Sequence, residues 1–148
     1  MVIITEPRLP VSPADLAGRR RDVLRLTWEE RRWGRRRRTT ENGREVALAL
    51  PTGSVLSGGT VILVEPDWYL EVEAAPEPVI AVFPHDHAEA LRLAFEVGNR
   101  HFSLAIERDA LLVPDDPAME RLLTRLGVPW ERRTQVFTPI GFGHSHEP

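Results

Sequence analysis

The sequence of 148 residues predicts an α+β protein, with a β-rich first half and a second half in which strands and helices alternate. In the first half, apolar residues recur at every second position, which is the period of a half-buried strand. In the second half they also recur at helical spacing behind good N-cap residues. The segment Ala75-Pro76-Glu77-Pro78 separates the two patterns. We therefore expect two small domains, 1–74 and 75–140, that meet at this segment.

The first half predicts short strands and no helix after residue 22. Alternating or continuous apolar residues mark strands at 23–28, 46–50, 61–64 and 68–73. Between the first two, Asn42-Gly43 is a strong hairpin signal, because both residues tolerate the positive φ of a tight turn. Residues 1–74 are thus expected to form a small all-β domain.

Two helices are predicted in the second half. The first begins after Asp86, an N-cap residue with Glu89 placed to complete a capping box, and Gly98 is expected to end it. Its predicted buried face consists of Ala88, Leu91, Ala94 and Phe95. The second helix begins at Asp116-Pro117 and ends at Gly127. Its predicted buried stripe consists of Met119, Leu122, Leu123 and Leu126.

The strands of the second half complete a known arrangement. Apolar runs predict strands at 79–83, 102–107, 110–113 and 135–137. With the two helices, the order is β-α-β-β-α-β, which is the ferredoxin-like arrangement. Residues 141–148 are expected to form a flexible, histidine-containing tail.

Composition excludes several kinds of site. The chain has no cysteine, which excludes disulfides, thiolate metal sites and cysteine nucleophiles. All 19 basic residues are arginine, which excludes Schiff-base and phosphate-loop lysines. No apolar run reaches the roughly 18 residues of a membrane helix, and no signal peptide is apparent. We expect a cytoplasmic protein.

Histidine is therefore the natural candidate for metal chemistry, because imidazole binds nickel, copper and zinc. His101 closes Gly98-Asn99-Arg100-His101, between a predicted helix and the next strand. One imidazole per chain makes a poor metal site, but a twofold axis would bring two together. From spacing alone, a surface or helix-capping role is the alternative.

The other four histidines fall into two pairs. His144 and His146 would point the same way in an extended tail and could close around one ion, the alternative being an inert tail. His85 and His87 flank Asp86 at a helix start, where the side chains diverge and the helix dipole disfavours a protonated ring. We expect a structural role for this second pair, the alternative being an additional metal site.

The residues leave two other functions open. Arg35–Arg38, with Trp28 and Trp33 nearby, are compatible either with RNA or ribosome binding or with a solvent-facing strand. The near-balanced charge of the first half argues against a strong nucleic-acid field. A hydrolase or isomerase that uses His101 as a general base has no recognisable partner carboxylate or nucleophile.

Several stretches, spread over residues 22–146, resemble the urease accessory protein UreE family. Arg36–Leu56 resembles part of the family's first domain, with Arg36-Arg37-Arg38-Thr39-Thr40 and Leu48-Ala49-Leu50-Pro51-Thr52-Gly53. Arg92–His101 is similar to the family's most characteristic stretch, a helix that ends in Gly-Asn-Arg-His. Arg121–Gly127 and Phe137-Thr138-Pro139 fall where the family has its second helix and closing strand, and the histidine-bearing C-terminus completes the resemblance.

This resemblance implies a homodimeric nickel chaperone rather than an enzyme. The family's motif histidine maps onto His101, which would face its symmetry mate, and its tail ligands map onto His144 and His146. Residues 1–74 would form a domain that resembles a peptide-binding module, and residues 75–140 would bind metal and dimerise. The implied partners are the accessory GTPase UreG and, through it, the urease apoprotein assembly.

Two departures from the family pattern matter. The tail ends after two histidines instead of a polyhistidine run, which argues against bulk nickel storage. Val113-Pro114-Asp115-Asp116 stands where some relatives carry extra histidines, so an auxiliary site is not expected there. Because imidazole does not select nickel sharply, we also expect zinc and copper to bind.

Overall fold

The structure is a computed structural model that describes residues 1–140. The chain divides into two compact units, Met1–Ala75 and a second that begins at Pro76. The strands of each unit pair only within that unit, and each unit has its own hydrophobic core. The predicted α+β class is confirmed. The predicted tail, 141–148, lies outside the described residues together with His144 and His146. No helix within residues 1–140 is both long and apolar enough to cross a membrane.

Two three-stranded sheets build the first unit. In one, β4 pairs in parallel with β1 and antiparallel with β3; in the other, β6 pairs in parallel with β2 and antiparallel with β5. The strands are β1 (Val2–Ile4), β2 (Arg20–Leu26), β3 (Arg35–Thr39), β4 (Glu45–Ala49), β5 (Val61–Val64) and β6 (Trp68–Ala74). Alternate residues of both sheets, such as Val46, Leu48, Leu70 and Val72, are buried in one shared core, as the period of two predicts.

The first unit also contains two one-turn helices, α1 (Pro13–Leu16) and α2 (Trp28–Arg31). The expectation that no helix follows residue 22 is therefore wrong. The strand ends at Leu26, because Thr27 starts a capping box with Glu30. The Thr27 hydroxyl accepts from Glu30 N at 3.4 Å, and the Glu30 carboxylate accepts from Thr27 N at 2.8 Å. Trp28 is buried on this turn instead of in a strand.

Asp22 on β2 ties the two sheets of the first unit together. Its side chain is fully buried. It accepts hydrogen bonds from the Thr40 hydroxyl at 2.5 Å, Asn42 N at 3.0 Å and Val23 N at 2.8 Å, and it pairs with the Arg44 guanidinium at 2.9 Å. Thr40, Asn42 and Arg44 belong to the β3–β4 hairpin. A single carboxylate therefore fixes this hairpin to the neighbouring sheet.

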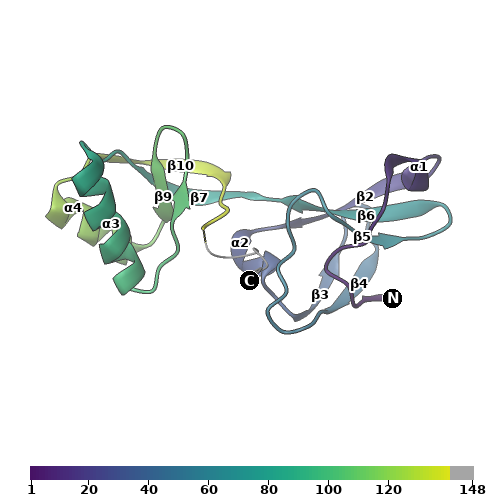
Figure 1. Cartoon of the computed structure of the whole chain (residues 1–148). Helices are drawn as coiled ribbons and strands as arrows, with labels where there is room; N and C mark the ends of the chain where they lie inside the picture. The colour runs from purple at the N-terminus through teal and green to yellow at the C-terminus, as the bar shows by residue number, and fades with distance from the viewer. Residues whose placement is uncertain (141–148) are drawn as a thin grey trace, which may run out of the picture. The chain divides into compact units, whose positions relative to one another are not determined.

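The second unit has the predicted βαββαβ order. Its four-stranded antiparallel sheet has the order β10-β7-β9-β8. The elements are β7 (Pro76–Val82), α3 (His87–Asn99), β8 (Ala105–Ile106), β9 (Leu111–Pro114), α4 (Pro117–Leu126) and β10 (Trp130–Val136). The two helices lie next to each other on one side of the sheet (Figure 1). Their apolar side chains pack on Ile80, Val82 and Val113 of that sheet.

The last strand is longer than predicted. β10 begins at Trp130, whereas the sequence pattern marks only residues 135–137. The strand lies at one edge of the sheet, and most of its side chains are exposed or half-buried. Its charged residues Glu131, Arg132 and Arg133 therefore carry no apolar alternation that a pattern could detect.

The second helix forms as predicted. Asp116 accepts from Ala118 N at 2.8 Å, Pro117 occupies the first turn, and Gly127 ends the helix with φ of 70°. Met119, Leu122 and Leu123 are buried. The predicted N-cap of the first helix is also confirmed, because Asp86 accepts from Glu89 N at 2.8 Å.

The predicted buried face of α3 is wrong. Leu93 and Val97 are fully buried, and Ala94 packs against their core, whereas Leu91 is 59% exposed and Phe95 67% exposed. The helix carries apolar residues on two sides, and helical spacing alone does not tell which side faces the sheet. The result is an exposed apolar face, Leu91 and Phe95, that no other part of residues 1–140 covers.

We predict that Asp22→Asn destabilises the first unit by about 3 kcal/mol at neutral pH, because it breaks a buried ion pair and its hydrogen bonds. Burial by itself would raise the pKa of Asp22, but the bonds from Thr40, Arg44, Asn42 and Val23 outweigh it and lower the pKa. A lowered pKa means that this stability is present above pH of about 4 and is lost as pH falls through the folded-state pKa.

Denaturant unfolding followed by tryptophan fluorescence at neutral and acidic pH tests this. The difference in stability between the natural chain and Asp22→Asn should shrink on acidification. Asp67→Asn, which makes the same change at an exposed position of the same unit, is the control. Equal effects of the two variants would contradict the assignment.

Candidate metal centre

His101 lies just beyond the C-terminus of α3 in a left-handed conformation. Its φ is 62°, the one positive φ of a residue other than glycine among those described. Its N–H donates to Gly98 O at 2.9 Å, and the N–H of Phe102 donates to Val97 O at 3.2 Å. These two bonds form a Schellman motif, in which the left-handed position is usually a glycine.

The prediction that Gly98 ends the helix is therefore wrong. Gly98 is helical, and His101 takes the left-handed position three residues later. Phe102 explains the choice, because this residue and Val97 both pack on the core of the second unit. Asparagine, aspartate and histidine are the non-glycine residues found most often in this conformation.

The His101 ring is presented to solvent. The residue is exposed, and within residues 1–140 no hydrogen bond or ion pair holds its imidazole. The turn fixes the backbone on which the ring is mounted and leaves both ring nitrogens available as ligands. A histidine in a rarely occupied backbone conformation indicates a local role that offsets its conformational cost.

A tight ion pair braces the last turn of α3 beside this histidine. The Arg100 guanidinium binds the Glu96 carboxylate at 2.6 Å and also donates to Glu96 O at 3.0 Å. The hydrogen bond from Arg100, helped by the charges of Arg125 and Arg92, lowers the pKa of Glu96 although partial desolvation raises it. The pair satisfies a carbonyl of the final turn, one of the groups that a helix end leaves free.

His101 adjoins the uncovered apolar face of α3. Leu91 and Phe95 are one turn apart on this face, and exposed Gly98 follows Phe95 by three residues. A β-carbon placed on Gly98 would meet nothing within 4 Å in this chain. Along α3 toward His101, the exposed surface is thus apolar at Leu91 and Phe95, and it carries no side chain at Gly98.

His85 and His87 lie at the opposite end of α3, about 20 Å from His101 along a helix of 13 residues. The His85 ring contacts the Glu89 carboxylate at 2.9 Å, and that carboxylate also accepts from His85 N at 2.9 Å. His85 thus takes part in the start of the helix. Neither histidine shares a site with His101.

The described part of one chain does not complete a metal site by itself. No group of three histidine, cysteine, aspartate or glutamate side chains among residues 1–140 could hold an ion. His101 is thus a single ligand, and the candidate tail ligands His144 and His146 lie outside the described residues.

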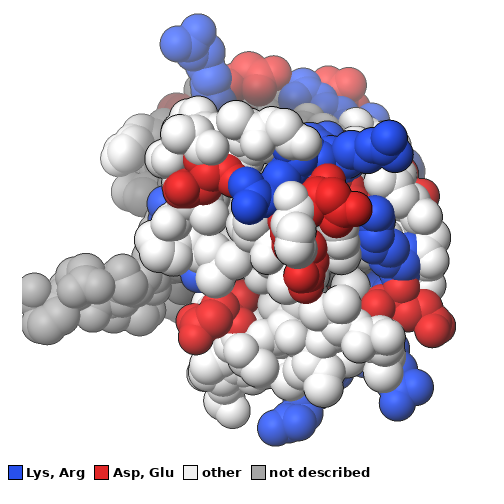
Figure 2. Space-filling model, turned by 90° about the vertical axis from the view of Figure 1, so that its right-hand side faces the viewer, with Lys and Arg blue, Asp and Glu red and all other residues white. Residues whose placement is uncertain are grey.

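Arg35–Arg38 lie on β3, as the interpretation of this run as a solvent-facing strand requires. Charged side chains of both signs are interspersed on the face shown in Figure 2. Across β2 and β6, likewise, Arg21 pairs with Glu71 at 2.9 Å and Arg25 with Glu73 at 3.1 Å. Such mixed charge on β2 and β6 gives these two strands no extended positive field of the kind that nucleic-acid binding uses.

The fold and the site together define a class: a two-unit binding protein whose ferredoxin-like unit presents one exposed imidazole at a helix end. Comparison with known proteins gives the family. The N-terminal domain of the UreE urease accessory protein matches residues 7–75, and the C-terminal domain of the same protein matches residues 77–147. The chain belongs to the UreE urease accessory protein family.

Individual relatives agree. Proteins named urease accessory protein UreE are 39% identical in Ralstonia nicotianae, 46% in Deinococcus radiodurans and 38% in Cupriavidus necator, over 86%, 76% and 93% of this chain. The matches span 63%, 72% and 73% of these relatives, so this chain matches about two thirds of their length. The family resemblance seen in the sequence is confirmed, and so is the expectation of a non-enzyme, because UreE proteins are accessory chaperones.

We predict that His101→Gly stabilises the second unit by about 1 kcal/mol, because glycine adopts the left-handed conformation without steric cost. His101→Ala removes the same imidazole but keeps the Cβ, and it should not be stabilising. Denaturant unfolding of both variants measures the difference. Equal stabilities would mean that the left-handed turn imposes no strain on residue 101.

Proposed function

We propose that this chain is a nickel chaperone that delivers nickel during assembly of the urease active site. Membership of the UreE family supports the proposal. The observation that carries it is the exposed imidazole of His101, mounted on a rigid turn at the end of an uncovered apolar helix face. A carrier needs a ligand that a partner can reach, and a buried ligand cage would not release its ion.

In this proposal the second half of the site comes from a second copy of the chain. Two exposed apolar side chains on one helix face, Leu91 and Phe95, favour burial against an equally apolar surface. A twofold axis near this face would pack Leu91 and Phe95 of one copy against the same two residues of the other copy. The missing side chain at Gly98 lets two helices approach closely next to His101, and thereby brings the two imidazoles together.

His144 and His146 complete the proposed ligand set. Nickel takes more ligands than two imidazoles, and a tail that swings in or out would close or open the coordination shell. All-imidazole ligation does not discriminate sharply among late first-row metals, so zinc and copper also bind in this proposal. Selectivity for nickel would come from supply and from partner recognition.

The proposed partners follow from the same assignment. The homodimer, formed through residues 75–140, would pass nickel to the accessory GTPase UreG and through it to the urease apoprotein, in the cytoplasm. Residues 1–74 would contact a partner or peptide instead of the metal. The exposed location of His101 supports transfer to a partner protein, because a ligand at the surface can be shared between two proteins.

We predict that His101→Gly loses the tightest nickel site while the fold survives, because the variant removes the central ligand but suits the turn. Calorimetric titration with nickel measures this, with His87→Gln as the matched control at an exposed histidine. In the natural chain, affinity should be lower at mildly acidic than at neutral pH, because protons compete with the metal for the imidazoles.

Truncation after Gly143 should lower the affinity or the stoichiometry but leave the dimer intact, because it removes only the tail histidines. Full nickel affinity in His101→Gly, or affinity that is unchanged between mildly acidic and neutral pH, would contradict imidazole ligation by this residue.

We predict that the double variant Leu91→Gln with Phe95→Gln is monomeric, because it makes the proposed dimer face polar. Both side chains are exposed in one chain, so the fold should be unaffected. Light scattering measures the mass, and Ile106→Gln, at a residue 63% exposed on β8 of the same unit, is the control. A dimeric double variant would show that the copies meet elsewhere.

A further inference from the structure

The first unit has an open sheet edge that carries four successive arginines. β3 pairs with β4 on one side, and no described strand pairs with its other side. We propose that this edge binds an extended, acidic segment of a partner protein, which adds to the β1-β4-β3 sheet as a fourth strand. This binding is separate from nickel carriage and does not depend on it.

The hydrogen-bond pattern of the hairpin shows which backbone groups are available. Leu50 N donates to Gly34 O at 2.7 Å, and Thr40 N donates to Arg44 O at 2.8 Å. Because bonded pairs alternate in an antiparallel ladder, the even-numbered residues of β3 face β4. The N–H and C=O groups of Arg35, Arg37 and Thr39 therefore point to the open edge. They offer an incoming strand regularly spaced donors and acceptors.

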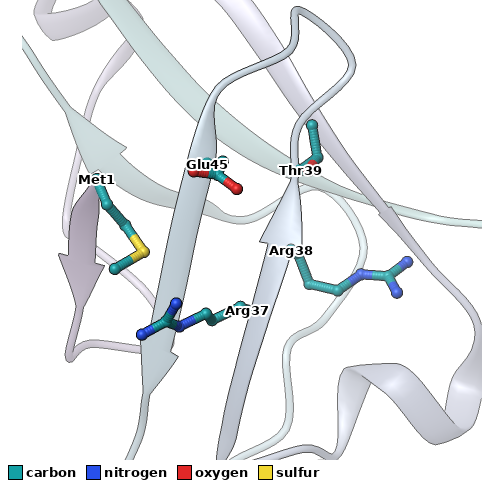
Figure 3. Close-up of a pocket in the computed structure, with 5 residues that line it drawn as sticks. All are labelled: Met1, Arg37, Arg38, Thr39 and Glu45. Carbon is teal, nitrogen blue, oxygen red and sulfur yellow. The ribbon is translucent and has the colours of Figure 1, made fainter.

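The side chains at this edge are basic on both faces of the sheet. Successive residues of a strand point to opposite faces. Figure 3 shows Arg37 reaching across β4 toward Met1, whereas Arg38 points the other way. On the face of Arg38, the Arg36 guanidinium lies 4.2 Å from the centre of the Trp33 ring. An added strand would therefore meet arginines whichever face its side chains take.

Most of these arginines have no carboxylate partner among residues 1–140. Within residues 1–140, Arg35, Arg36 and Arg37 make no ion pair, whereas Arg38 binds Glu30 at 3.1 Å. On the face of Arg37, a depression of about 450 Å³ is lined by Met1, Arg37, Arg38, Thr39 and Glu45 (Figure 3). The space beside Arg37 is thus large enough for an acidic side chain, but it is lined by the acid Glu45 as well as by arginine.

The same face carries exposed apolar residues. In the register of the sheet, Ile3 and Arg37 flank Ala47 on its two sides. Ile3 is 64% exposed and Met1 67% exposed. An acidic segment with apolar residues among its acids would therefore find partners for both kinds of side chain.

An acidic peptide fits this edge better than the other candidate occupants. A second copy of β3 would set arginine against arginine, and like charges directly opposite are destabilising. An RNA strand would satisfy the guanidinium groups, but its phosphates cannot match the alternating N–H and C=O groups of the edge. A carboxylate-bearing strand satisfies both, and arginine binds carboxylates through two parallel hydrogen bonds.

Two substitutions at one residue separate strand addition from simple charge attraction. Arg37→Gln removes the charge and keeps the N–H, whereas Arg37→Pro removes both. Proline is tolerated at an edge position whose N–H faces solvent, so the fold should survive. The probe is a synthetic capped peptide, Thr-Glu-Val-Glu-Val-Glu-Thr, with a lysine-for-glutamate version as its control.

With the full chain, fluorescence anisotropy should give binding about threefold weaker for Arg37→Gln, and at least tenfold weaker again for Arg37→Pro. Arg121→Gln on α4, an exposed arginine with no ion pair within residues 1–140, should bind like the natural chain. Equal losses in the two Arg37 variants, or tighter binding of the lysine peptide, would overturn the proposal.

Amide exchange measured by NMR on the natural chain keeps the test independent of whether the proline variant folds. The peptide should protect the amides of Arg35, Arg37 and Thr39, while those of Arg36 and Arg38 are already protected by β4. Binding without this protection would overturn strand addition. An oligouridylate that binds more tightly than the peptide would assign the edge to nucleic acid instead.

Discussion

The orientation of α3 about its own axis is fixed by the burial of Leu93 and Val97, and the functional features of the second unit follow from it. With these two side chains against the sheet, Leu91 and Phe95 face outward. The chain must then leave the helix so that Phe102 reaches the same core as Val97, and this demands a left-handed residue at position 101. Core packing thus places both the apolar face and the exposed imidazole.

Much of this fold could be predicted from sequence because its signals are local. The caps at Asp86 and Asp116 and the glycine at Gly127 bind or shape only the backbone of their own turn, and all three behave as their residue types predict. The position of His101 at the end of an element could be predicted for the same reason. The buried side of α3 could not, because the choice between its two apolar sides depends on a sheet formed by distant residues.

Arginine has two different roles in the first unit, although the sequence shows the same residue in both places. Arg21 and Arg25 lie on β2, and the neighbouring strand β6 supplies their partners Glu71 and Glu73. The arginines of β3 lie at an edge where no described strand can supply any. Composition alone could not separate the two groups, since the fold decides which arginines meet a carboxylate. Arg38 of β3 meets Glu30 of α2, whereas Arg35, Arg36 and Arg37 make no ion pair within residues 1–140.

The left-handed turn at residue 101 also restricts how this position could be re-engineered. Branched and bulky side chains are strained at such a φ, and glycine, asparagine, aspartate and histidine are the residues that accept it best. Of these, only histidine and aspartate offer good metal ligands, and aspartate suits harder ions such as magnesium or manganese. The backbone alone therefore limits the ion preferences that mutation can reach at this position, because a cysteine thiolate would carry a larger conformational penalty than histidine does.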